Sequence, residues 1–168
     1  MFKEINVYEL NDNVFKLFAK DWAIINVDCG HKVNSMTASW LQIGHLWQEY
    51  VVSVYVRKQR YTYEFIDQAN TFSISFFDDQ YRKELVYLGQ YSGRDVDKLA
   101  QCHFTCSKDG EIPYIDQSKM TLICEKLYHY DLDEKHFDEQ KIVDMHYPEK
   151  DFHRVYVARI KKILVKGE

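Results

Sequence analysis

In the expected strand over residues 71–77, residues 71–76 alternate strictly between small hydroxyl side chains and large apolar side chains, which restricts this segment to an extended conformation. The apolar set is Phe72, Ile74 and Phe76, and the hydroxyl set is Thr71, Ser73 and Ser75. Further strands are expected over residues 22–27, 49–56, 120–131 and 152–165. Residues 49–56 are almost continuously apolar or aromatic, as in a strand covered on both faces. The pattern predicts a mainly β fold built as a mixed antiparallel barrel.

Helices are expected at the periphery of this barrel, over residues 14–20, 61–69, 78–87 and 95–101. Residues 29–31 are expected to form a turn, residues 107–116 a loop, and residues 132–148 an irregular segment. Residues 41–48 are ambiguous. The elements do not follow a strand–helix–strand repeat, and no linker divides the chain, so we expect a single domain over residues 1–168.

The composition excludes several classes of function. Apolar residues make up 46% of the chain, as expected for a folded globular protein rather than a disordered one. The net charge is −4 and no long basic run occurs, which argues against a nucleic-acid partner. No apolar stretch approaches the length of a membrane span, and the N-terminus lacks the apolar core of a signal peptide. We therefore expect a cytoplasmic protein with no membrane partner.

The cysteines are Cys29, Cys102, Cys106 and Cys124. Without a secretion signal we expect free thiols rather than disulfides. Cys102 and Cys106 enclose His103, but no second ligand pair of matching spacing accompanies them. The sequence therefore predicts no metal site.

A run of small hydroxyl and amide side chains marks the first candidate site: Asn34, Ser35, Met36, Thr37, Ala38, Ser39 and Trp40. We expect it to form a loop whose backbone N–H groups and hydroxyls could hold a phosphate. Trp40 would add a flat apolar surface beside it. An ordinary hydroxyl-rich turn is the alternative, and this run alone does not separate the two.

Two further donor-rich segments follow. Residues 57–62 place Arg57, Arg60, Tyr61 and Thr62 where a strand ends and a helix begins, and arginine binds phosphate through a planar fork of donors. A third polar turn precedes a helical segment and consists of Ser92, Gly93, Arg94 and Asp95. Three such turns at element boundaries predict one anionic ligand with an extended body.

In these motifs and their order the chain resembles the flavin reductase-like family, whose members bind FMN in a split β-barrel. The matching segments are residues 34–40, 56–65, 92–98 and 151–156. The resemblance runs from about Phe15 to the C-terminus. It implies a flavin reductase-like FMN-binding split β-barrel with peripheral helices over residues 1–168, and a homodimer with the flavin near the subunit interface.

The resemblance also implies roles for single residues. Ser39, Arg60 and Thr62 would contact the FMN phosphate, and residues 34–38 would line the edge of the isoalloxazine ring. The other implied cofactor contacts are Trp40, Arg57, Tyr61, Ser92, Gly93, Arg94, Asp95 and Lys98. Two alternatives stay open: Arg57 could pair with an acid, and Lys98 could be a solvated helix charge. No catalytic side chain is assigned, because the flavin carries the chemistry.

The chain has only six glycines and no Gly-x-Gly-x-x-Gly motif, so a separate dinucleotide site is not expected. The resemblance implies that NAD(P)H stacks on the flavin and passes hydride to it, and that an unknown acceptor receives the electrons. Residues 41–42 are bulkier than the family pattern and could reshape this pocket. A flavin-binding electron carrier without efficient NAD(P)H turnover is therefore the alternative, and a barrel that binds no flavin is a third. His153 could move a proton near neutrality or could bond a core partner.

Overall fold

The computed structural model describes residues 1–28 and 30–167. Its strands are β1 (Phe2–Ile5), β2 (Ala23–Asp28), β3 (Val33–Ala38), β4 (Leu41–Leu46), β5 (Glu49–Arg57), β6 (Thr71–Phe76), β7 (Cys106–Asp109), β8 (Ile112–Ile115), β9 (Met120–Asp131) and β10 (His153–Lys166). Its α-helices are α1 (Val14–Lys16), α2 (Tyr61–Ile66), α3 (Arg82–Gln90), α4 (Lys98–Gln101) and α5 (Gln140–His146). Short helical turns of other types are η1 (Val7–Glu9), η2 (Leu17–Asp21), η3 (Asp79–Tyr81) and η4 (Glu134–His136).

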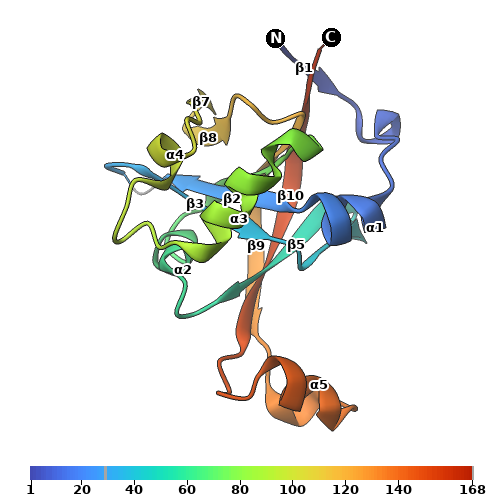
Figure 1. Ribbon diagram of the computed structural model, residues 1–168. Coiled ribbons are helices and arrows are strands. Elements are labelled where there is room, and N and C mark those ends of the chain that lie inside the picture. Colours follow the sequence, from blue (N-terminus) through green and yellow to red (C-terminus); the bar gives the residue numbers. More distant parts are fainter. Residues whose placement is uncertain (29, 168) are drawn as a thin grey trace.

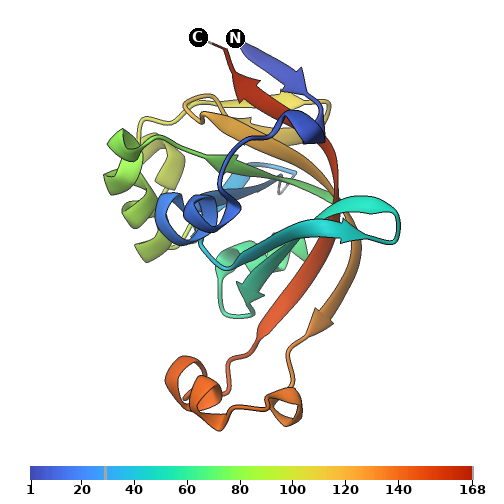
Figure 2. The ribbon, with the colours of Figure 1, turned by 90° about the vertical axis from the view of Figure 1, so that its right-hand side faces the viewer.

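One antiparallel sheet forms the body of the molecule, in the order β3-β2-β6-β9-β10-β5-β4, with β1 paired to the end of β10. The two ends of this order are consecutive in the sequence, and only Ser39 and Trp40 join them. Two residues and their flanking bonds span at most about 11 Å, so the sheet must curl until its edge strands meet there. Figure 2 shows this curl. The expected mainly β, split-barrel fold is confirmed.

The two sets of side chains in residues 71–76 lie on opposite faces of β6, as expected. Phe72, Ile74 and Phe76 are fully buried in the main apolar core. Ser73 and Ser75 are also fully buried, on the opposite face of β6, and each accepts a hydrogen bond of 3.1 Å from Asn26 Nδ2 on β2. The sheet is therefore covered on both faces at this point, with an apolar layer inside and a hydrogen-bonded polar layer outside.

Helices cover one side of the barrel. α3 packs against β3, where the Thr37 hydroxyl donates a 2.5 Å hydrogen bond to Leu85 O, and a second apolar cluster fills the space beneath η3 and α3. Figure 1 shows α2, α3 and α4 on this side, with both chain termini together at one end of the molecule. This arrangement places the ends of α3 and β3 side by side.

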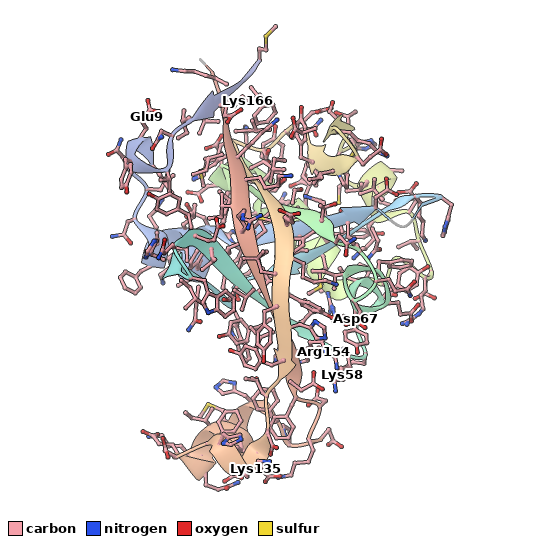
Figure 3. The ribbon with its side chains drawn as sticks, turned by 180° about the vertical axis from the view of Figure 1, so that it is seen from behind. Glu9, Lys58, Asp67, Lys135, Arg154 and Lys166 are labelled. Atoms are coloured by element: carbon pink, nitrogen blue, oxygen red, sulfur yellow. The ribbon has the colours of Figure 1, made fainter. Side chains whose placement is uncertain are left out.

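A projecting arm occupies the opposite end. β9 and β10 continue beyond the barrel, and residues 132–152 between them carry η4 and α5 (Figure 2). Arg154, Asp67 and Lys58 lie at the foot of the arm, whereas Lys135 lies near its tip (Figure 3). Arg154 pairs with Asp67 and with Asp131, which itself pairs with Lys58, so a charge network ties the foot of the arm to the barrel.

Several expected elements differ in the structure. Residues 34–38 form strand β3 rather than a loop, because β2 supplies backbone partners and α3 covers them. Residues 107–116 form most of the β7–β8 hairpin, with Gly110 in its turn at φ +59°. Residues 132–148 contain α5. The ambiguous residues 41–48 form mainly β4, and the expected turn at residues 29–31 includes Cys29, which lies outside the described residues.

The longest α-helix in the described ranges is α3, with nine residues. Across residues 1–28 and 30–167 no helix combines the length and the apolar character needed to cross a membrane.

Candidate functional site

A cleft opens where the barrel is split, beside the link between β3 and β4. We call it the aromatic cleft. Its volume is about 230 Å³. It is lined by Met36, Thr37, Ala38, Ser39, Trp40, Tyr55, Arg57, Arg60, Gly89 and His153. Five of the residues predicted from the first motif therefore meet residues from β5, α3 and β10 around one space.

A second cleft of about 250 Å³ adjoins the first, and we call it the cationic cleft. It is lined by Gln59, Arg60, Tyr61, Thr62, Gln90, Tyr91, Ser92, Gly93, Arg94 and Lys98. Arg60 lines both clefts and marks their junction. The second and third motifs thus come together in space, and the two clefts form one elongated site with an aromatic end and a positively charged end.

Arg60 and Lys98 are the central charges of the cationic cleft. Arg60 Nη1 donates a 3.0 Å hydrogen bond to Gly89 O, and Lys98 Nζ donates one of 3.0 Å to Leu88 O. These carbonyls end helix α3, where the helix dipole is negative. Lys98 is only 5% exposed, which rules out a solvated helix charge. Within residues 1–28 and 30–167, neither cation has a carboxylate partner.

Burial lowers the pKa of the Arg60 guanidinium. Burial, with a smaller contribution from the nearby positive charge of Arg60, lowers the pKa of Lys98 to about 8. A buried positive charge at Lys98 and a half-buried one at Arg60, which repel each other, favour a negatively charged ligand between them. The cationic cleft is therefore electrostatically suited to an anion.

Hydrogen bonds and one close backbone approach also hold the three motifs together. Asn34 Nδ2 donates a 2.7 Å hydrogen bond to Thr62 Oγ1, and Lys32 Nζ donates one of 2.8 Å to Gly93 O. A Cβ atom at Gly93 would lie 2.2 Å from Asn34 Oδ1, so this close approach requires glycine. Segments some 30 residues apart in the sequence are thereby held in one place.

The polar side chains of β3 mainly make hydrogen bonds within the protein. Asn34 and Ser35 are buried, and the Ser35 hydroxyl donates a 2.7 Å hydrogen bond to Asn26 Oδ1. Thr37 bonds to α3, as described above. Because β3 is an edge strand, part of its backbone N–H groups face away from the sheet. The contact of residues 34–38 with a ligand stays a prediction, and the backbone is better placed for it than the side chains.

Two of the predicted arginines are paired with acids. Arg57 forms an ion pair with Asp151 and lies 5.1 Å above the Tyr147 ring, so it lines the aromatic cleft with its charge compensated. Arg94 is exposed, forms an ion pair with Glu64 and lies over the Tyr61 ring. Ser92 accepts a hydrogen bond from the Arg94 backbone N–H, and Asp95 faces a larger neighbouring cleft instead.

The aromatic wall of the first cleft includes residues that sequence reasoning did not assign to it. Tyr55 and His153 come from paired strands β5 and β10, and the Trp40 and His153 ring centroids are 4.9 Å apart. The alternation of side chains along β5 was the available signal for Tyr55. Trp47 packs against Tyr128 and does not line the cleft.

His153 is 6% exposed, and its Nδ1 shares a 2.8 Å hydrogen bond with the Tyr147 hydroxyl. Burial and, to a smaller extent, the positive charge of Arg57 lower its pKa to about 4. The imidazole is therefore neutral at physiological pH and bonds a core partner. A proton exchange near neutrality is not supported.

Among the residues that the structure describes, no group of three or more His, Cys, Asp or Glu side chains is placed to hold a metal ion. Cys102, Cys106 and Cys124 carry free thiols, while Cys29 lies outside the described residues.

Comparison with known proteins gives a family match. The model of the flavin reductase like domain matches residues 15–164, which is most of the chain. No curated protein sequence gives a significant match.

Solved structures share the fold at low identity. Flavoredoxin from Methanosarcina acetivorans is 21% identical, with a TM-score of 0.68 over 87% of this chain and 68% of that chain. An FMN-binding domain of flavin reductases-like enzyme from Shewanella baltica OS155 is 15% identical, with a TM-score of 0.71 over 98% and 77% of the two chains. An FMN-binding protein from Thermus thermophilus with bound p-hydroxybenzaldehyde is 20% identical, with a TM-score of 0.67 over 96% and 82%.

Proposed function

This chain belongs to the flavin reductase-like domain family, and from that membership we propose that it is a cytoplasmic, homodimeric FMN-binding oxidoreductase. In this proposal it passes hydride from NAD(P)H to the flavin and on to an acceptor. One observation carries the proposal: a buried lysine and a half-buried arginine, neither with a carboxylate partner among the described residues, lie at one end of a cleft whose other end is aromatic.

The charge of the cationic cleft fits the phosphate of FMN. Arg60 and Lys98 together carry two positive charges that no carboxylate of the described residues compensates, and a phosphate monoester carries close to two negative charges at neutral pH. Riboflavin would leave both cations uncompensated. FMN is therefore the flavin that the residues fit, with Thr62 and Ser92 as further neutral groups beside the phosphate.

The residues of the aromatic cleft would hold the ring. Trp40, Tyr55 and His153 supply flat faces, and Ala38 and Gly89 leave room between β3 and α3. When bound, FMN supplies the hydride and electron chemistry. The protein orients the ring, excludes water from its covered face and compensates the phosphate charge.

The bulky residues 41–42 do not narrow this cleft. Leu41 points into the main core, and Gln42 Oε1 accepts a 3.0 Å hydrogen bond from the Tyr55 hydroxyl. An electron carrier remains the second candidate. His153, at the foot of the arm, forms part of the wall of the aromatic cleft, and two of the similar structures are flavoredoxins.

The test is an absorption spectrum of the purified protein with FMN, followed by NADH and by NADPH without oxygen. A bound flavin band that bleaches within seconds supports the reductase. A bound flavin that both donors leave oxidised supports the carrier, and no binding by the folded protein removes both.

The homodimer is proposed from exposed apolar side chains near the β4–β5 turn and on β9. Leu46, Trp47, Tyr128 and Tyr130 are 41–57% exposed, and Trp47 and Tyr128 are in contact. Such a patch on an antiparallel sheet is typical of an interface. Sedimentation should give twice the chain mass of 20.2 kDa, and a monomer at micromolar concentration would contradict it.

FMN affinity should depend on pH through Lys98. The lowered pKa means that Lys98 in the flavin-free protein is charged below about pH 8 and neutral above it. Binding a phosphate dianion above that pH requires the uptake of a proton, so the Kd for FMN should rise about fivefold to tenfold between pH 7 and pH 9. Fluorescence titration measures this change.

Lys98→Arg is the matched variant, because arginine stays charged throughout this range. Its FMN affinity should be flat from pH 7 to pH 9. An equally flat profile in the unmodified protein would show that Lys98 does not contact the phosphate.

A further inference from the structure

His153 lines the aromatic cleft, and one of its ring nitrogens has no hydrogen-bond partner among the described residues. His153 is more than nine-tenths buried and lines this cleft, and its Nδ1 is bonded to the Tyr147 hydroxyl at 2.8 Å. For Nε2 the described parts of the chain offer no hydrogen-bond partner. A polar atom without a protein partner at the wall of a cleft is available to whatever molecule the cleft holds.

The environment of Tyr147 decides which His153 nitrogen carries the proton. Tyr147 is 3% exposed, and in residues 1–28 and 30–167 its hydroxyl has one hydrogen-bond partner, His153 Nδ1. A buried hydroxyl needs an acceptor for its proton, so it donates to Nδ1. Nδ1 then carries no proton, and the neutral ring carries its proton on Nε2.

We propose that Tyr147 is a positioning residue that fixes His153 as the Nε2–H tautomer, and that this N–H is the donor which the aromatic cleft offers to a carbonyl oxygen of a planar ring. The identity of that ring rests on the proposed function. The oxygen belongs either to the isoalloxazine ring or to the carboxamide of a nicotinamide, and the two sources share this chemistry.

The arm holds Tyr147 in this position. Tyr147 directly follows α5, and its ring stacks on Phe152 with centroids 4.7 Å apart. Arg57 also lies over the Tyr147 ring, donates a 2.8 Å hydrogen bond to His146 O and pairs with Asp151. The phenol therefore cannot leave His153 without loosening the foot of the arm.

The groups around His153 favour a neutral ligand. The facing rings are Trp40 and Tyr55, and Arg57 is compensated by its ion pair with Asp151. Arg60, which has no carboxylate partner among the described residues, lies at the junction with the cationic cleft. The lowered pKa of His153 agrees with a ring that stays neutral and keeps one N–H donor. A planar carbonyl compound matches these properties better than a cation or a free carboxylate.

Nitrogen-15 NMR of the imidazole rings in the whole purified protein tests the tautomer directly. We expect His153 to be protonated at Nε2 alone between pH 6 and pH 8, with the signal assigned by its absence in His153→Gln. In Tyr147→Phe this preference should be lost, whereas the matched variant Tyr114→Phe, outside the cleft, should keep it. A proton on Nδ1 in the unmodified protein would overturn the proposal.

Binding measurements then separate the two sources of the carbonyl. If the oxygen belongs to the flavin, Tyr147→Phe should weaken FMN and riboflavin binding by about threefold to tenfold. If it belongs to the nicotinamide, flavin affinity should hold while the KM for NADH rises by a similar factor and kcat changes less. Unchanged values for both, in a variant whose circular dichroism is normal, would overturn the donor role.

These outcomes are distinct from a failure of the proposed function. A protein that binds no flavin would remove FMN as the ligand, but the tautomer measurement on the flavin-free protein would still decide the role of Tyr147.

Discussion

Replacing Arg60 with alanine should weaken FMN binding by about 1.5–3 kcal/mol, because a charge-assisted hydrogen bond to the phosphate is lost. The loss corresponds to a Kd roughly 10 to 150 times higher. Isothermal titration of the folded variant measures it. Arg60 also bonds Gly89 O, so part of the effect arises from a looser end of α3.

The comparison with riboflavin isolates the phosphate. Arg60→Ala should leave riboflavin affinity nearly unchanged, and Arg60→Lys should restore part of the FMN affinity through charge alone. Arg82→Ala is the matched control, because Arg82 lies over Trp22 and lines neither cleft. FMN binding of full strength in folded Arg60→Ala would remove Arg60 from the site.

Replacing Asn26 with alanine should lower the free energy of unfolding by about 3–5 kcal/mol, because each orphaned buried polar group costs about 1–3 kcal/mol. Asn26 is fully buried, and its amide links Ser35, Ser73 and Ser75. Ser35 would lose its hydrogen-bond acceptor, and a small cavity would add to the loss.

Urea unfolding monitored by fluorescence gives this free energy. Asn70→Ala, at an exposed position, is the matched control and should change stability by less than about 0.5 kcal/mol. A loss below about 1 kcal/mol for Asn26→Ala would mean that water replaces the amide. Such a result would contradict a dry polar layer between β2, β3 and β6.

The strands with a strong local signal were predictable. β5, β6 and β9 repeat an apolar or alternating pattern within their own sequence, and their predicted bounds agree closely with the structure. β3 was wrongly expected to be a loop, because its short polar side chains are typical of turns. Their partners Asn26, Thr62 and Leu85 come from three other elements, and no local rule indicates such partners.

The candidate site, like the fold, could be predicted only in part from the sequence. Residue type identified Arg57 and Arg60 as candidates, but only the fold shows that Arg57 pairs with Asp151, 94 residues away, while Arg60 pairs with no acid in residues 1–28 and 30–167. Tyr55, Gly89 and Tyr147 carry no motif. Tyr55 and Gly89 reach the aromatic cleft through strand register and through the end of α3, whereas Tyr147 reaches His153 through the arm.

Arg60 and Lys98, which bond carbonyls at the end of α3, affect how long the chain persists in a cell. Without flavin, the half-buried Arg60 and the buried Lys98 hold like charges close together, which favours opening of the segments that carry them. A ligand that binds only the folded form stabilises it by mass action. Chains made when flavin is scarce should therefore be degraded sooner by proteases, so that the supply of cofactor sets how much of this protein persists.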